Sequence, residues 1–153
     1  MENDSHIQIL LVEDTPGDTR LIKEAFHHLG KPVKLHHAWH GAEALEFLRR
    51  KSPFGDAPRP DLILLDLDIP EMDGREVLAQ IKADPYLKSI PTVILAASAD
   101  PADVLICYKL HANCYLEKPK NWEEFDYLAT NIYRFWLAKS VRAMTPQNCP
   151  TPR

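Results

Sequence analysis

The sequence predicts an α/β fold, a doubly wound parallel sheet of five strands in the order 2-1-3-4-5 with five flanking helices. Five short runs of strand character alternate with segments of helical period, an order that is typical of this architecture. Residues 7–12, 62–65 and 92–96 are apolar almost throughout, which suits strands buried on both faces of a parallel sheet. The runs at 33–38 and 113–116 are weaker, and the last is expected at an edge of the sheet.

The helices are expected from apolar residues three and four positions apart and from residues that favour helix ends. The first helix follows Asp14 or Thr15 as its cap, carries Pro16 in its first turn and stops near Gly30, and the fourth begins at the pair Asp100-Pro101. Apolar residues mark the buried faces of the first, second, third and fifth helices. In that order they are Leu21, Ile22, Ala25, Phe26 and Leu29; Ala42, Leu45, Phe47 and Leu48; Val77, Leu78 and Ile81; and Trp122, Phe125, Leu128, Ile132 and Phe135 or Trp136.

Size and charge limit what the chain can be. Its 153 residues suffice for one domain with a hydrophobic core, which we place at residues 6–138, and residues 139–153 are expected to form a flexible tail or an arm. A net charge of -4 is not the basic footprint of nucleic-acid binding. No apolar run approaches the roughly 20 residues of a membrane helix, and the start of the chain lacks a secretory signal, so we expect a cytoplasmic protein without membrane partners.

Polar residues stand where the predicted strands end. Glu13 and Asp14 follow the first strand, Asp66 ends the third with Asp68 two residues later, and Lys118 follows the fifth. Because the carboxyl ends of parallel strands share one edge of the sheet, these side chains are expected to lie together at a ligand site. Each of these residues alone would be an ordinary strand-end cap or loop residue, and the full set makes that interpretation improbable.

The combination of several carboxylates and one ammonium indicates a particular chemistry. Clustered carboxylates repel one another unless a cation joins them, and their oxygen atoms suit Mg²⁺. A carboxylate beside such an ion can attack a phosphoryl donor and become an acyl phosphate. A neighbouring lysine can then neutralise the charge of the transferred group.

These residues resemble the receiver domains of two-component response regulators. The resemblance covers about residues 6–138 and rests on Glu13-Asp14, on Asp66 followed by Ile69-Pro70 and Asp73-Gly74, and on Lys118-Pro119. It implies the flavodoxin-like version of the fold, with Asp66 as phosphoacceptor, Lys118 as its partner and a Mg²⁺ site made by Glu13, Asp14, Asp66 and the backbone carbonyl of Asp68. It also implies a signalling protein that is not an enzyme in the ordinary sense.

The position that ends the fourth strand departs from the family pattern. Ala96 stands where the family usually has threonine or serine, whose hydroxyl bonds the phosphoryl group, and Tyr115 occupies the family's aromatic switch position. A hydrogen bond to a charged group contributes about 1.5–3 kcal/mol, so its loss could weaken the switch unless Ser98 substitutes. A receiver-like interaction module that no longer switches is therefore the alternative function.

Partners follow from a finer resemblance and from two unusual helices. The segments LLVEDTPGDTRLIKEAF and RPDLILLDLDIPEMDGREVLAQIK resemble the single-domain regulators of bacterial and cyanobacterial phytochromes, which implies a light-sensing histidine kinase as phosphodonor. The fourth helix is apolar on all sides, and the fifth ends in adjacent aromatic residues, so we expect a homodimer through these elements and the fifth strand. The residues assigned to that surface are Val104, Ile106, Tyr108, Phe135 and Trp136.

An enzyme is the rival from another class. The pair Asp66 and Asp68 resembles the nucleophile motif of haloacid-dehalogenase-type phosphatases, but that motif usually follows the first strand, and no later acidic motif completes the set. The seven histidines, including His36 and His37, lack the spacing of metal ligands and are expected at the surface.

Overall fold

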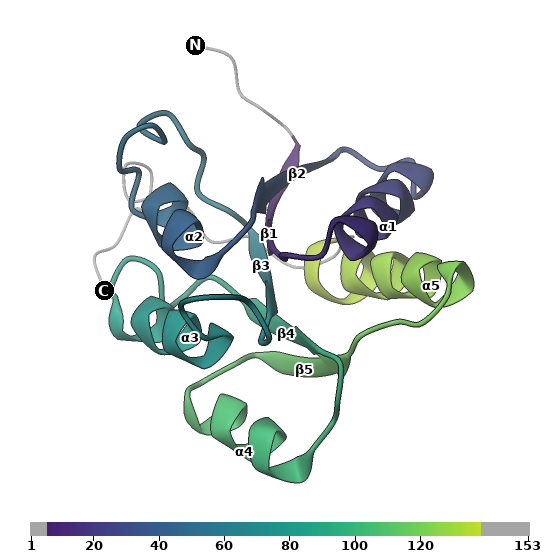
Figure 1. The fold of residues 1–153 in the computed structure, drawn as a ribbon. Helices are drawn as coiled ribbons and strands as arrows, with labels where there is room; N and C mark the ends of the chain where they lie inside the picture. Colours follow the sequence, from purple (N-terminus) through teal and green to yellow (C-terminus); the bar gives the residue numbers. More distant parts are fainter. Residues whose placement is uncertain (1–5, 139–153) are drawn as a thin grey trace.

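Residues 6–138 are described by the computed structural model, and they form one parallel sheet wrapped by helices (Figure 1). The strand order β2-β1-β3-β4-β5 confirms the predicted doubly wound, flavodoxin-like architecture. The expectation of a tail or arm at 139–153 lies outside the described residues. The strands are β1 (Ile7–Val12), β2 (Val33–Ala38), β3 (Leu62–Asp66), β4 (Thr92–Ala96) and β5 (Cys114–Glu117).

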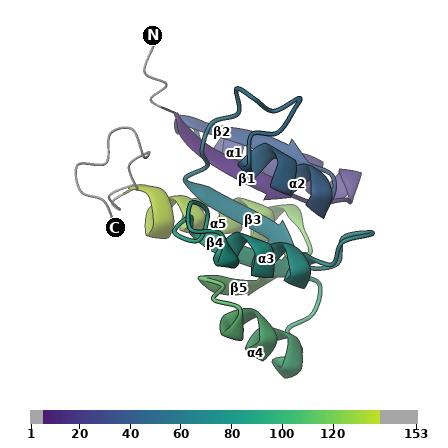
Figure 2. The same cartoon turned by 90° about the vertical axis from the view of Figure 1, so that its left-hand side faces the viewer.

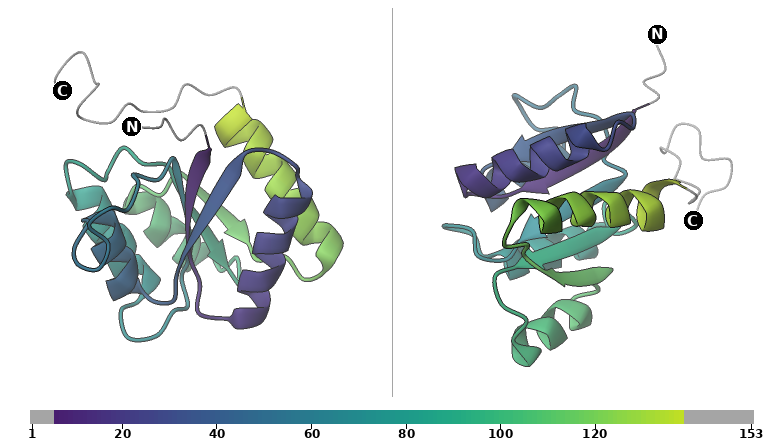
Figure 3. Two further views of the ribbon diagram at one scale, coloured as in Figure 1. Left: turned by 90° about the horizontal axis from the view of Figure 1, so that it is seen from above. Right: turned by 90° about the vertical axis from the view of Figure 1, so that its right-hand side faces the viewer.

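The helices cover the sheet unequally. Figures 1 and 3 show the first and fifth helices side by side on one face, with the second and third on the other. The fourth helix lies beyond the β5 edge of the sheet (Figure 2), where it packs on β5 and the third helix. The helices are α1 (Pro16–His28), α2 (Gly41–Leu48), α3 (Gly74–Ala83), α4 (Pro101–Lys109) and α5 (Trp122–Ile132), which continues into a π-helical turn, η1 (Tyr133–Ala138).

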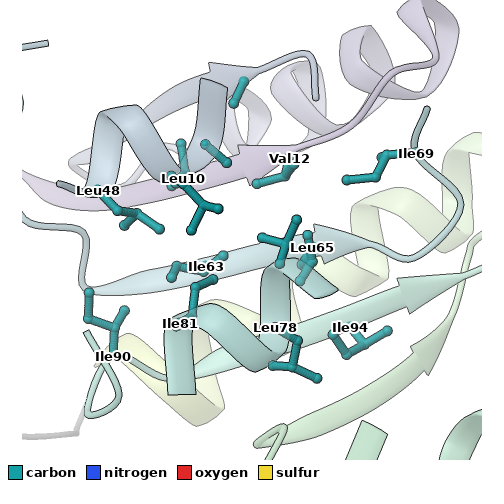
Figure 4. Packing of buried hydrophobic residues seen from close by; sticks show 14 of the residues in the cluster. Leu10, Val12, Leu48, Ile63, Leu65, Ile69, Leu78, Ile81, Ile90 and Ile94 are labelled. Atoms are coloured by element: carbon teal, nitrogen blue, oxygen red, sulfur yellow. The ribbon is translucent and has the colours of Figure 1, made fainter. Parts of the chain in front are cut away.

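Two hydrophobic layers sandwich the sheet because successive strand residues point to opposite faces. Leu10 and Val12 of β1 pack toward α2 and α3, together with Ile63 and Leu65 of β3 (Figure 4). The residues between them, such as Leu11, pack toward α1 and α5. This double burial explains why β1, β3 and β4 are apolar runs rather than alternating ones.

Helix ends mostly follow the local signals of the sequence. The side chains of Asp73, Asp100 and Asn121 each accept a hydrogen bond from the first turn of their helix. Thr15 stands at the N-terminal cap of α1, but its side chain makes no capping hydrogen bond. Gly30 follows α1 with a positive φ of 72°, as expected for a glycine after a helix.

The end of α5 differs from the prediction of a regular helix through Phe135 or Trp136. The helix widens at Tyr133, and a π-helical turn carries more residues per turn than an α-helix. The apolar face therefore shifts, so that Leu137 is buried while Phe135 is 72% exposed. None of the helices within residues 6–138 is both long and apolar enough to cross a membrane.

Gly74, the first residue of α3, provides a test of how closely this helix packs on the end of β3. A Cβ atom there would lie 2.6 Å from both the carbonyl oxygen of Asp66 and the Cα of Leu67. We expect Gly74→Ala to reduce the free energy of unfolding by about 1–3 kcal/mol, as overpacking does, in urea denaturation. Gly17→Ala is the matched control because its Cβ would meet nothing within 4 Å, and an equal loss in both variants would contradict this packing.

Candidate functional site

The strand ends bring together the carboxylates that the sequence placed there. Glu13 follows β1 and Asp66 ends β3, its hydrogen-bonded neighbour in the sheet. Oxygen atoms of Glu13, Asp14 and Asp66 all lie within 4.8 Å of one another. Glu13 and Asp66 are buried, whereas Asp14 is half-buried at the mouth of the site.

Lys118 crosses from the end of β5 into this acidic group. Its ammonium lies 3.0 Å from Glu13 Oε1, 3.1 Å from Asp66 Oδ2 and 3.1 Å from Asp18 Oδ2. Its backbone N–H donates to the carbonyl of Ala96 at 2.7 Å, which anchors the residue to the end of β4. The lysine therefore joins carboxylates from β1, β3 and α1 in one ion cluster.

Burial and charge shift the ionisation of both partners. Burial, together with the hydrogen bond and the charge of Asp66, raises the pKa of Glu13 to about 7. Burial alone lowers the pKa of Lys118, but the carboxylates of Asp66 and Glu13 outweigh it, and the pKa is raised above its ordinary value. The ammonium thus stays charged at neutral pH, while Glu13 is close to half-ionised.

The oxygen atoms of this cluster fit a divalent cation. Glu13 Oε1 is buried and makes no hydrogen bond to the described residues, because its contact with Lys118 lacks hydrogen-bond geometry. An oxygen atom in that state, beside two more carboxylates, is the kind of ligand that Mg²⁺ or Mn²⁺ prefers. Such an ion would also offset the repulsion that raises the pKa of Glu13.

Asp68 plays a different part in this arrangement from the other three acids. Its side chain is exposed and does not join the group of converging carboxylates. Its backbone N–H donates to Asp66 Oδ1 at 3.0 Å. Asp66 is therefore held from both sides, by this N–H on Oδ1 and by the ammonium of Lys118 on Oδ2.

The sequence did not lead us to assign two residues of the site, Asp18 and His37. Asp18 could have been found, because a residue in the first turn of α1 faces the same edge as the strand ends. The Nε2 of His37 lies 2.7 Å from the carbonyl oxygen of Glu13 and 3.4 Å from Thr19 Oγ1. The expectation that His36 and His37 are surface residues was wrong, since both are half-buried on β2, and burial lowers the pKa of His37.

The candidate switch residues lie on neighbouring strands. Ala96 is buried at the end of β4 and brings no polar group to the site. The hydroxyl of Tyr115 donates to the carbonyl of Ser98 at 2.7 Å. The hydroxyl of Ser98 accepts a hydrogen bond from the backbone of Asp100 at 3.1 Å, so in this structure it supports the start of α4.

The surface assigned to dimerisation is only partly exposed. Ile106, Tyr108 and Phe135 are exposed, but Val104 and Trp136 are half-buried, and Trp136 packs against the α1–α5 layer. The hydroxyl of Tyr108 accepts a hydrogen bond from the backbone N–H of Tyr115 at 3.2 Å, on the outer edge of β5. A largely apolar groove of about 680 Å³ runs between β5 and α5 and is bordered by Phe135 and Trp136.

Comparison with known proteins gives this geometry a context. A family model described as the response regulator receiver domain matches residues 9–128. Response regulator Rcp1 from Synechocystis sp. is 44% identical over 129 residues, which cover 84% of this chain and 88% of that protein. A helix-and-strand arrangement shared with such relatives is expected at this identity.

Solved structures show the same fold. The crystal structure of the phosphorylated cyanobacterial phytochrome response regulator RcpA superimposes with a TM-score of 0.86 at 43% identity, covering 92% of this chain and all (100%) of that one. The Mn²⁺-bound form of Rcp1 gives a TM-score of 0.83 at 42% identity, covering 90% and 99%. The match of sequence, fold and acidic pocket shows that this chain belongs to the family of response regulator receiver domains and is homologous to phytochrome response regulators.

Proposed function

We propose that residues 6–138 form a receiver domain that accepts a phosphoryl group on Asp66 from a sensor histidine kinase in a Mg²⁺-dependent reaction. The observation that carries this proposal is the position of Asp66, with Oδ2 3.1 Å from the ammonium of Lys118 and Oδ1 bound by the N–H of Asp68. These contacts orient the carboxylate at a site with further acidic groups for a cation. They are the requirements of a carboxylate nucleophile for phosphoryl transfer.

The proposed reaction is a displacement at phosphorus. An oxygen atom of Asp66 attacks the phosphorus, the bond from phosphorus to the donor breaks, and the donor leaves with that electron pair. Lys118, whose pKa is raised, stays protonated and can neutralise the negative charge of the transferred group. Its existing contact with Asp66 means that little reorganisation is needed.

Glu13, Asp14 and Asp66 would hold the Mg²⁺, together with the carbonyl of Asp68. A bound cation supplies charge neutralisation for the phosphoryl oxygens and orients the donor. The buried Oε1 of Glu13, which accepts no hydrogen bond from residues 6–138, supports a cation at this place. His37 would act as a positioning residue, because its ring fixes the backbone carbonyl of Glu13.

A phytochrome-type histidine kinase is the phosphodonor that we propose. The support is the similarity to Rcp1 and to the cyanobacterial phytochrome response regulator RcpA over nearly the whole length of those chains. With such a partner the protein would act in the cytoplasm, and this is the location that we propose.

A homodimer through the α4-β5-α5 surface is the proposed output state. Ile106, Tyr108 and Phe135 are exposed there, beside the apolar groove along β5. The outer edge of β5 is unpaired in the sheet. A second copy would cover these apolar groups, and exposed apolar patches commonly mark protein interfaces.

Incubation with acetyl phosphate and Mg²⁺ tests the phosphoacceptor. We expect the intact protein to gain the mass of one phosphoryl group, because Asp66 is the oriented carboxylate. The gain should be absent in Asp66→Asn and after chelation of the metal. Labelling that persists in Asp66→Asn would show that another group is phosphorylated.

Mg²⁺ binding should depend on pH through Glu13, whose pKa is about 7. A cation binds the ionised carboxylate, so the affinity should rise with pH toward neutrality, and below the pKa it should fall by up to about tenfold per pH unit. Isothermal titration calorimetry between pH 6 and pH 8 measures this slope. Glu13→Gln should bind Mg²⁺ more weakly with a flatter pH profile, and an unchanged slope in that variant would assign the titration to another group.

Replacement of Phe135 tests the dimer. We expect sedimentation analysis of the phosphorylated protein to give twice the chain mass and Phe135→Asp to give the monomer mass, because a charge would be buried in the interface. Tyr86→Asp is a matched control, since Tyr86 is 70% exposed and Phe135 is 72% exposed. A monomer mass for the phosphorylated parent at high concentration would refute the dimer.

Ala96 favours one alternative, a receiver-like interaction module that no longer switches. Its methyl group cannot donate to a phosphoryl oxygen, and the hydroxyl of Ser98 is held at the start of α4, where it accepts the backbone N–H of Asp100. If the missing hydroxyl weakens switching, Ala96→Thr should strengthen phosphorylation-dependent dimerisation in the same sedimentation assay. Equal dimerisation of the parent and Ala96→Thr would show that this chain switches without the hydroxyl, and a parent that cannot be phosphorylated would favour the alternative module.

A further inference from the structure

A second charged cluster lies at the opposite end of the sheet from the carboxylates, where the strands begin. Figure 4 shows Leu48 and Ile90 at the start of β3, whereas Ile69 lies beyond its carboxyl end. A pocket of about 300 Å³ opens there, a volume at the small end of the range for ligand sites. We call it the arginine pocket, and its lining includes Arg49, Arg50, Arg59, Asp84 and Tyr86.

The charges of the arginine pocket are unbalanced within the described part of the chain. Three arginines line the pocket with one acid, Asp84, and the charge of Asp61 also acts on Arg59, although the whole chain has a net charge of -4. Asp84 Oδ1 accepts the N–H of Tyr86 at 2.8 Å, and Oδ2 lies 3.9 Å from the Nε of Arg49. The two carboxylates, Asp61 and Asp84, therefore leave at least one of the three cations without a balancing negative charge.

Arg50 occupies a backbone position that does not suit it. Its φ is 54°, and the N–H of Lys51 donates to the carbonyl of Glu46 at 2.9 Å, which is the hydrogen bond that closes a helix before a left-handed residue. Glycine is the favoured residue there, because a side chain is strained in this conformation. An arginine at this place gives up stability and directs a cation to the pocket, a conflict that is expected mainly at functional sites.

Arg59 forms the fixed wall of the pocket. It donates to the carbonyl of Tyr86 and to Ser89 Oγ, the latter at 2.9 Å, so its position is set by the segment between α3 and β4. Burial, and then the charge of Arg50, lower the pKa of Arg59, and the charges of Asp61 and Asp84 offset this only in part. An anion between Arg50 and Arg59 would remove the repulsion of the two cations.

We propose that the arginine pocket binds a compact phosphate-bearing anion with at least two negative charges. A guanidinium group can donate two parallel hydrogen bonds to phosphate oxygens, and three arginine residues line this space, which would hold one small ligand. The exposed ring of Tyr86 borders the pocket and leaves its mouth open to solvent. The site is separate from Asp66, so its ligand would bind without occupying the phosphoacceptor.

Titration with inorganic pyrophosphate in metal-free buffer tests the proposal, because omission of divalent ions keeps the acidic end repulsive to the probe. We expect saturable shifts of the guanidinium Nε–H signals of Arg49, Arg50 and Arg59 in nuclear magnetic resonance spectra. The amide signals of Asp66 and Lys118 should stay unchanged. Absence of saturable shifts at the three arginines, or shifts confined to the acidic end, would overturn the proposal.

The variant Arg50→Gly separates binding from structure. Loss of one charge-assisted contact should weaken pyrophosphate binding about tenfold or more, while the glycine relieves the backbone and should keep or raise the thermal unfolding temperature. Arg20→Gln removes an equal charge from the exposed face of α1 and should bind like the parent. Parental affinity in Arg50→Gly would overturn the proposal. Both variants should be phosphorylated by acetyl phosphate at the same rate as the parent, because the pocket is separate from Asp66. The binding test therefore stands whether or not Asp66 is the phosphoacceptor.

Discussion

The ammonium of Lys118 among the carboxylates of Glu13, Asp18 and Asp66 is the interaction on which the functional end of this molecule depends. Without it, two buried acids would face each other with no cation, and burial of unpaired charge is costly. The lysine also ties β5 to the strands at the centre of the sheet. A change of charge at Asp66 therefore acts directly on the edge strand, through one side chain.

The dry interior of the sheet makes this ion cluster possible. Strands β1, β3 and β4 are buried along their whole length, and their charged residues come only where the strands stop, as Glu13 does after β1 and Asp66 does at the end of β3. Parallel strands put all of these stops at the same edge. The contrast between apolar strands and polar ends both positions the carboxylates and keeps them close enough to shift the pKa of Glu13.

Local patterns of buried strands and strand ends were sufficient for the doubly wound sheet and for the convergence of Glu13, Asp14, Asp66 and Lys118, and the resemblance to receiver domains supplied the strand order. The sequence was insufficient where a contact depends on how segments pack. His37 meets the carbonyl of Glu13 only because it pairs with Leu11 in the sheet, a register that no local pattern encodes. The half-buried state of Val104 and Trp136 likewise follows from the placement of α4 at the edge and from the π-helical turn after α5.

Besides the side chain of Lys118, a second link between the site and the outer surface runs through hydrogen bonds to backbone groups. Ala96 has no side-chain hydroxyl, yet its carbonyl accepts the N–H of Lys118, and Tyr115 binds the carbonyl of Ser98 just beyond. Tyr108 in turn binds the N–H of Tyr115 from α4. A displacement of the segment after β4 would therefore reach β5 and α4 through hydrogen bonds to main-chain groups. Alanine at position 96 removes the side-chain hydroxyl from this path, but the main-chain hydrogen bonds remain.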